Sequence, residues 1–331
     1  MAMQATSAYG SPTLAPSLTR PLHAAALAIS LIYVPQLPGS PSTRNADNPA
    51  KMRSPREWGM PYEDVRIVTT DGVALHGWYI PAPAAAGGDT GDTAATLIFF
   101  HGNAGNIGIR LPNIYELHSK LSCAVLAIDY RGYGESERGN GPCERGLNLD
   151  ADAALAWLLS REDVDRSKIF LFGRSLGGAV AIALAARALP HIICGIILEN
   201  TFTRMIDVAV QVMLPLRLLP REFLHERVLR SRWDSRAAIQ EGRVRAPLLF
   251  VSGLADELVP STQMRQLFNI ACEVAAKAGE GSAKHEIVTF ATGTHNETFN
   301  APGYYAALAR FVHEQCKIRE QRDLGSLNDV D

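Results

Sequence analysis

The chain has 331 residues, of which 47% are hydrophobic and 20% charged, a balance typical of a packed globular protein. Its net charge of −2 provides no overall field that would attract nucleic acid, so we expect no nucleic-acid partner. The five cysteines are scattered and odd in number and form no Cys-x-x-Cys pair, which argues against a disulfide framework and against a zinc site.

The first 50 residues differ in composition from the rest of the chain. Residues 21–43 contain no Asp, Glu, Lys or Arg, and the apolar core within them ends at Pro35. That core is about 13 residues long, shorter than the ~18–20 that a membrane-spanning helix needs. We interpret residues 1–50 as a leader or membrane-associated segment: a targeting segment, half of an anchor, or a leader that packs on the domain.

After residue 51, short apolar runs alternate with helical patterns, which predicts an α/β fold with a mostly parallel sheet of about eight strands. The first two runs flank the Asp71-Gly72 turn and predict an antiparallel hairpin. The predicted strands are 65–69, 73–80, 95–100, 124–129, 168–173, 192–199, 247–252 and 286–291, and the predicted helices lie near 107–119, 144–160, 176–188, 261–278 and 303–318.

Residues 201–245 interrupt this alternation and contain no strand-like run. We interpret them as a small helical cap over the carboxyl ends of the strands, the edge at which ligands bind in open α/β sheets. The predicted hydrolytic domain therefore spans residues 51–320 and includes this cap, and residues 321–331 are predicted to be a polar tail.

The sequence Gly-Arg-Ser-Leu-Gly-Gly at 173–178 lies where a predicted strand meets a predicted helix. A Gly-x-Ser-x-Gly motif is weak evidence alone, but in this setting it is typical of a nucleophile elbow, a sharp turn that exposes a serine hydroxyl. We therefore predict that Ser175 is a nucleophile rather than an ordinary helix-capping serine, and that the Leu176 N–H points into the same space.

A serine hydroxyl needs a base to take its proton, and that base must lie at the same edge of the sheet. His295 follows the last predicted strand at that edge, whereas His285 precedes the strand, so His295 is the predicted base. In this fold the acid comes between the serine and the histidine in the chain. Asp256 is preferred to Glu257 for its short reach, and Glu199 is a less favoured substitute that we expect to bond loop backbone.

The glycine-containing sequence His-Gly-Asn-Ala-Gly-Asn at 101–106 follows the third predicted strand. Its backbone N–H groups can turn inward, so the N–H groups of Asn103 and Leu176 are the predicted donors to an oxyanion. We expect His101 to brace this loop and Asp129 to hold a nearby glycine-rich turn. The chain has no His-Glu-x-x-His, Walker or Gly-x-Gly-x-x-Gly motif, and we predict no metal and no cofactor.

Taken together, these motifs resemble the α/β-hydrolase superfamily and, more narrowly, alpha/beta hydrolase domain-containing protein 13 and its bud-emergence Bem-like relatives. The resemblance rests on the segments HGNAGNIGIRLP, DYRGYGES, GRSLGGAVAI, ENTFT, SGLADELVP and GTHNETF. It implies the α/β-hydrolase fold, with Ser175 as nucleophile, Asp256 as acid, His295 as base, and Asn103 and Leu176 as oxyanion donors. It also implies association with a membrane, because such relatives typically carry an amino-terminal anchor.

We therefore expect an intracellular or membrane-associated serine hydrolase that cleaves acyl esters or thioesters of lipids or proteins, in the manner of a palmitoyl-protein hydrolase, through a covalent acyl-enzyme. Two alternatives stay open: a serine peptidase or amidase of the same fold, and a non-catalytic interaction protein that keeps the fold. Residues 213–233 hold five arginines against two glutamates among many leucines. We interpret them as a cap whose leucines pack on the sheet and whose arginines are solvated or paired; the alternative is that this cap binds an anionic membrane surface.

Overall fold

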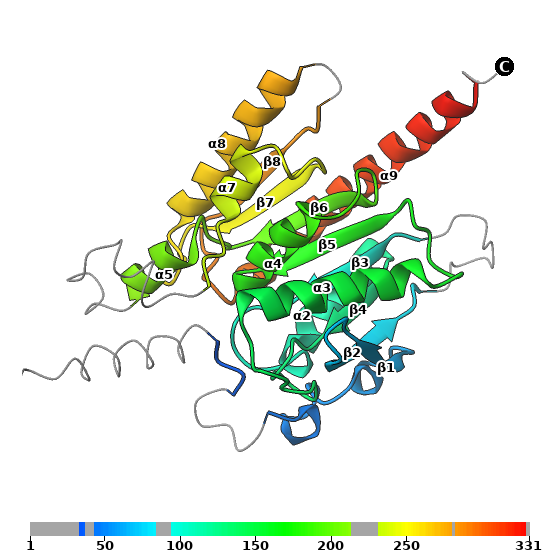
Figure 1. Cartoon of the computed structure of the whole chain (residues 1–331), viewed down its shortest axis with the longest axis vertical. Helices are drawn as coiled ribbons and strands as arrows, with labels where there is room; N and C mark the ends of the chain where they lie inside the picture. Colours follow the sequence, from blue (N-terminus) through cyan, green and yellow to red (C-terminus); the bar gives the residue numbers. More distant parts are fainter. Residues whose placement is uncertain (1–32, 37–42, 84–93, 213–230, 280–281, 329–331) are drawn as a thin grey trace, which may run out of the picture.

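The computed structural model describes residues 33–36, 43–83, 94–212, 231–279 and 282–328. At its centre lies an eight-stranded sheet in the order β1-β2-β4-β3-β5-β6-β7-β8 (Figure 1). The strands are β1 (Glu63–Val68), β2 (Ala74–Ile80), β3 (Thr96–Phe100), β4 (Ala124–Ile128), β5 (Ile169–Arg174), β6 (Ile193–Glu199), β7 (Leu248–Gly253) and β8 (Glu286–Phe290). β2 pairs antiparallel with β1 and with β4, and the remaining pairs are parallel, so the predicted hairpin and mostly parallel sheet are confirmed.

Helices cover both faces of this sheet. The described α-helices are α2 (Leu111–Leu121), α3 (Glu144–Leu159), α4 (Leu176–Ala185), α5 (Met205–Val212), α7 (Ser235–Gln240), α8 (Ser261–Ala278) and α9 (Tyr304–Asn328). Helices α3, α4, α7 and α8 pack on one face, and α2 and α9 pack on the other (Figure 1). A hydrophobic core lies on each face: Ile98 of β3 packs in the core under α3, α4, α7 and α8, and Phe99 packs in the core under α2 and α9. Burial on both faces explains why the central strands are continuous apolar runs.

Helix α9 is longer than the sequence predicts. It continues to Asn328, beyond the expected end near residue 318 and through most of the expected polar tail. No proline follows Pro302, and Lys, Arg, Glu and Gln, which are good helix formers, dominate residues 317–322. An ion pair of 2.8 Å between Glu320 and Lys168 also joins this part of the helix to the loop before β5.

The segment before residue 37 contacts the domain where the structure describes it. Val34 forms a parallel β-bridge with Ala104, and the Tyr33 hydroxyl donates to Ser231 Oγ at 2.8 Å. Trp233 Nε1 in turn donates to the Tyr33 hydroxyl at 2.9 Å. Residues 33–36 therefore join the loop after β3 to the part of the 201–245 insertion that precedes α7.

Two regions that bear on membrane association lie outside the described residues. These are residues 1–32, with most of the apolar leader, and residues 213–230, with four of the five arginines of the predicted cap. Within the predicted cap, the structure describes residues 201–212 and 231–245, which include the helices α5 and α7. Among the described residues, no helix combines the length and the apolar character required to cross a bilayer. Association with a membrane stays a prediction.

Candidate active site

Ser175 lies at a sharp turn between β5 and α4. Its backbone has φ 53° and ψ −116°, a conformation that side-chain-bearing residues rarely adopt. Small neighbours permit the turn: a Cβ on Gly173 would lie 2.2 Å from the Gly177 carbonyl oxygen, and one on Gly177 would lie 2.0 Å from that of Phe100. The Ser175 N–H donates to the Glu199 carbonyl at 2.9 Å. The half-buried Ser175 thus stands at the crest of the turn, as a nucleophile elbow requires.

His295 and Asp256 form a buried pair at the same edge of the sheet. His295 Nδ1 lies 2.8 Å from Asp256 Oδ2, and the two side chains are 7% and 1% exposed. The other carboxylate oxygen of Asp256 accepts the N–H groups of Leu258 and Val259 at 2.9 and 2.8 Å. Among the described residues, Glu257 accepts one hydrogen bond, from the backbone N–H of His295 at 3.3 Å. The carboxylate holds the proton on Nδ1, which leaves Nε2 as the acceptor nitrogen of the ring.

The residues just after β6 hold the serine turn and the histidine loop together. Asn200 Nδ2 donates to the carbonyls of Thr294 at 3.1 Å and His295 at 3.2 Å. The Thr201 hydroxyl donates to the Ser175 carbonyl at 2.7 Å. Among the described contacts no hydrogen bond joins Ser175 Oγ to His295 Nε2, a bond that often tightens only when substrate binds. Asn200 was missed in the sequence, although its place after a buried strand at the active edge could have identified it.

The two predicted oxyanion donors come from different elements: Asn103 lies in the loop after β3, and Leu176 follows Ser175 directly as the first residue of α4. Asn103 Oδ1 accepts the Tyr133 hydroxyl at 2.9 Å and the Val34 N–H at 3.1 Å, which fixes the side chain. Within the described part of the chain, neither the Asn103 N–H nor the Leu176 N–H donates to an acceptor. A Cβ built on Gly102 would lie 3.8 Å from the Ser175 Cβ, so this loop borders the nucleophile.

His101 is fully buried at the base of the same loop. Its Nδ1 lies 2.7 Å from the Gly102 carbonyl, and its ring packs on the Tyr130 ring with centroids 4.3 Å apart. Burial lowers the pKa of His101 to about 4, so the imidazole is neutral at pH 7. Asp129 accepts the Ile107 N–H at 2.8 Å and thereby ties the far end of the loop to the sheet.

The depressed pKa of His101 predicts a loss of stability in acid. The unfolded imidazole, with a pKa of 6.5, binds a proton at pH values where the folded one, with a pKa of about 4, does not. Stability is therefore fully present above pH 6.5 and falls as the pH decreases toward 4, by about 3 kcal/mol in all for one such group.

In His101→Gln, the slope of unfolding free energy against pH in this window should decrease by up to ~1.4 kcal/mol per pH unit, as measured by urea unfolding at several pH values. The exposed His313→Gln is the control and should keep the wild-type slope. Equal slopes in the wild type and His101→Gln would contradict the burial argument.

Glu199 does not contact the histidine, and the expectation that its side chain bonds loop backbone is wrong. Its carboxylate pairs with Arg174, with Nε and Oε1 3.0 Å apart, and accepts the Tyr304 hydroxyl at 2.6 Å. Arg174 and Glu199 are direct partners in the pairing of β5 with β6, and both are buried. A buried guanidinium needs a partner of opposite charge, and the neighbouring strand supplies one. Only the main-chain carbonyl of Glu199 bonds a loop, at Ser175.

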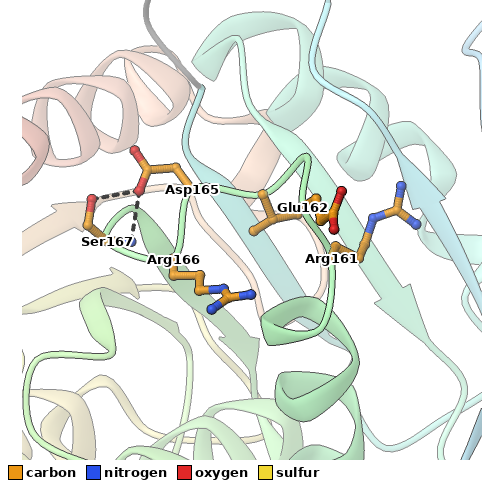
Figure 2. A pocket seen from close by; sticks show the side chains of 6 residues that line it. Arg161, Glu162, Asp165, Arg166 and Ser167 are labelled. Atoms are coloured by element: carbon orange, nitrogen blue, oxygen red, sulfur yellow. Dashed lines mark hydrogen bonds between the residues drawn. The ribbon is translucent and has the colours of Figure 1, made fainter.

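A hollow elsewhere on the molecule does not have the features of an active site. It measures about 640 Å³ and is lined by the loop 161–167 before β5, at the sheet edge opposite Ser175 (Figure 2). Its labelled side chains diverge, and Asp165 is bonded to Ser167. Arg161 is held by Glu63 and Asp163. Within the described residues, no three His, Cys, Asp or Glu side chains gather as metal ligands.

Known proteins resemble this chain in sequence and in fold. Residues 95–223 match a family model described as alpha/beta hydrolase fold. The chain is 37% identical over 311 residues to Alpha/beta hydrolase domain-containing protein WAV2 of Arabidopsis thaliana, covering 89% of this chain and 90% of that protein. It is 36% identical over 266 residues to Protein bem46 of Schizosaccharomyces pombe, covering 79% and 80%. The solved Pyrococcus furiosus esterase Pf2001 shares the fold, with a TM-score of 0.59 and 21% identity over 79% of this chain and 95% of that one.

Proposed function

Because this chain belongs to the α/β-hydrolase family, among relatives such as WAV2 and bem46, we propose that it is a serine hydrolase that cleaves acyl esters or thioesters. The family expected from the motifs is confirmed, and its fold is that of hydrolases. One observation supports the proposed serine mechanism. The strained turn at Ser175 lies at the same sheet edge as His295 and Asp256, whose Nδ1 and Oδ2 atoms are 2.8 Å apart.

In the proposed reaction, Ser175 Oγ attacks the acyl carbonyl carbon while His295 Nε2 takes the hydroxyl proton. Asp256 stabilises the resulting imidazolium through Nδ1. The N–H groups of Asn103 and Leu176 donate to the oxyanion of the tetrahedral intermediate. The carbon–oxygen or carbon–sulfur bond then breaks, and the leaving group takes the proton from His295. Water attacks the acyl-enzyme by the same steps and releases the carboxylic acid and Ser175.

Esters and thioesters are the acyl substrates that Ser175, His295 and Asp256 can cleave most easily, because their leaving groups depart readily. Their leaving groups are alkoxides or thiolates, which depart with one proton from the imidazole. A peptide amide has a much poorer leaving group and also needs binding contacts on both sides of the scissile bond. This difference in leaving-group chemistry supports the ester or thioester proposal over the amidase alternative.

The proposal is tested with three substrates that share an octanoyl group: a p-nitrophenyl ester, an aryl thioester and a p-nitroanilide. We expect the ester and the thioester to react roughly a hundredfold faster in kcat/KM than the anilide, with Ser175→Ala as the background. Faster cleavage of the anilide would identify an amidase. Rates that match the Ser175→Ala background for all three would favour a non-catalytic protein.

A further inference from the structure

We propose that a groove at the amino ends of β6, β7 and β8 binds a single-chain amphipathic anion, a fatty carboxylate or an alkyl phosphate. The groove has a volume of about 720 Å³, within the range of small-molecule sites. Helices α8 and α9, which pack on opposite faces of this part of the sheet, contribute its walls (Figure 1). It lies at the edge opposite Ser175, so the inference is independent of the proposed reaction.

The apolar part of the groove is built by four segments of the chain. Ile193 comes from β6, Val244 from the loop before β7, Val274 and Ala278 from α8, and Ile318 from α9. Ile318 remains 39% exposed, one of the few large apolar side chains in the described residues with so much contact with water. Covering this surface with an alkyl chain is favourable, because it removes apolar surface from contact with water.

The charged part of the groove is entirely basic. Arg245, Lys284, Arg319 and Arg322 line it, and no Asp or Glu is found among the described lining residues. None of the four forms an ion pair with a described carboxylate. Among the described contacts, Arg319 donates through Nε alone, to the Ser167 carbonyl at 3.3 Å, so its two terminal nitrogens can donate to a ligand. In a chain of net charge −2, this concentration of positive charge favours an anionic head group.

Two further polar groups in the groove have donors without a partner among the described residues. Gln315 is only 6% exposed, and its amide makes no hydrogen bond within the described part of the chain. The amide atoms are not fully enclosed, so they can bond water or a ligand that enters the groove. His285 Nδ1 accepts the Leu248 N–H at 3.2 Å, and burial lowers the pKa of His285 to about 4. The neutral ring therefore carries its proton on Nε2, where it can donate.

These features together select the ligand class. An alkyl chain fits the apolar wall, and a carboxylate or phosphate accepts from the guanidinium groups and the Gln315 amide. A nucleic acid fits poorly, because no Phe, Tyr or Trp is among the described lining residues on which a base could stack. Carboxylate and phosphate share this chemistry, and the experiment separates them.

The test uses the full chain with Ser175→Ala, so that no ligand is bound covalently or turned over at Ser175. Decanoate, decyl phosphate and decanol are titrated separately by calorimetry below their critical micelle concentrations, at low and at physiological salt. Both anions, or one of them, should bind at least about tenfold more tightly than decanol, and more weakly at the higher salt. The tighter anion identifies the head group.

Charge-reversal variants locate the binding. Lys284→Glu/Arg322→Glu should weaken anion binding at least about tenfold, whereas Lys120→Glu/Lys317→Glu, which reverses two charges outside the groove, should change it less than about twofold. Gln315→Met, which removes the amide and keeps the shape, should weaken it several-fold.

Three results would each overturn the inference: no binding of either anion, binding of decanol as tight as that of the anions, or equal effects of the two double variants. Because the Ser175→Ala chain is inactive in the proposed reaction, none of these results bears on the assignment of Ser175.

Discussion

Replacement of Ser175 by alanine is expected to reduce ester hydrolysis by about 10⁴–10⁶-fold and to leave the fold intact. The Ser175 hydroxyl makes no hydrogen bond among the described residues, and the side chain is only half-buried, so its loss removes the attacking atom and little packing. The measurement is kcat for a p-nitrophenyl ester together with thermal unfolding of the same sample.

Ser160→Ala is a matched control. Ser160 is an exposed serine at the end of α3 whose hydroxyl donates to the Trp157 carbonyl at 2.7 Å, and its replacement should leave kcat unchanged. A Ser175→Ala variant that is folded and retains more than about a hundredth of the wild-type rate would show that another group is the nucleophile.

Asp256→Asn is expected to lower kcat by roughly 10⁴-fold. The carboxylate accepts the His295 Nδ1 proton at 2.8 Å, and an amide in its place can donate to that nitrogen and stabilise the tautomer that blocks Nε2. The neighbouring N–H groups of Leu258 and Val259, which bond Oδ1, hold the side chain so that the other oxygen faces the ring. Steady-state kinetics at pH 7 measures the effect.

Glu257→Gln and Glu199→Gln are the comparisons for the acid. Glu257 bonds the backbone N–H of His295 and no other group in the described part of the chain, and the glutamine oxygen can keep that bond, so the loss of kcat should be far smaller. Glu199 is bonded to Arg174 and Tyr304, so its replacement should act mainly on stability. A larger loss of kcat in folded Glu199→Gln than in Asp256→Asn would move the acid to the end of β6.

The sheet could be predicted because it is covered on both faces. Continuous apolar runs such as those of β3 and β5 need no alternation with polar residues, and they are short enough to exclude helices. Once the strands are parallel, their carboxyl ends lie at one edge. The loops that carry Asp256, His295 and Asn103 follow β7, β8 and β3 at that edge. The direction of the strands is therefore enough to predict that these residues lie at the same edge as Ser175.

The supports of the site could not be predicted from local patterns. The Tyr304 hydroxyl bonds Glu199 across 105 residues of sequence, and Asn200 reaches the histidine loop across 95. Such contacts depend on the order of the strands in the sheet. The local pattern of a single sequence does not give that order. The predicted end of this helix, near residue 318, is wrong for a different reason: the residues that follow are polar, but they are good helix formers, and α9 continues to Asn328.

The most direct test of the account is the position of the covalent adduct. The full chain is treated with a fluorophosphonate, digested, and mapped by mass spectrometry, with Ser175→Ala and Asp256→Asn treated in parallel. If Ser175 is the nucleophile, one adduct forms, on the peptide that contains Ser175; it is absent from Ser175→Ala and forms much more slowly in Asp256→Asn. An adduct on a different residue, or continued ester hydrolysis by an enzyme that carries no adduct after full treatment, would contradict this assignment.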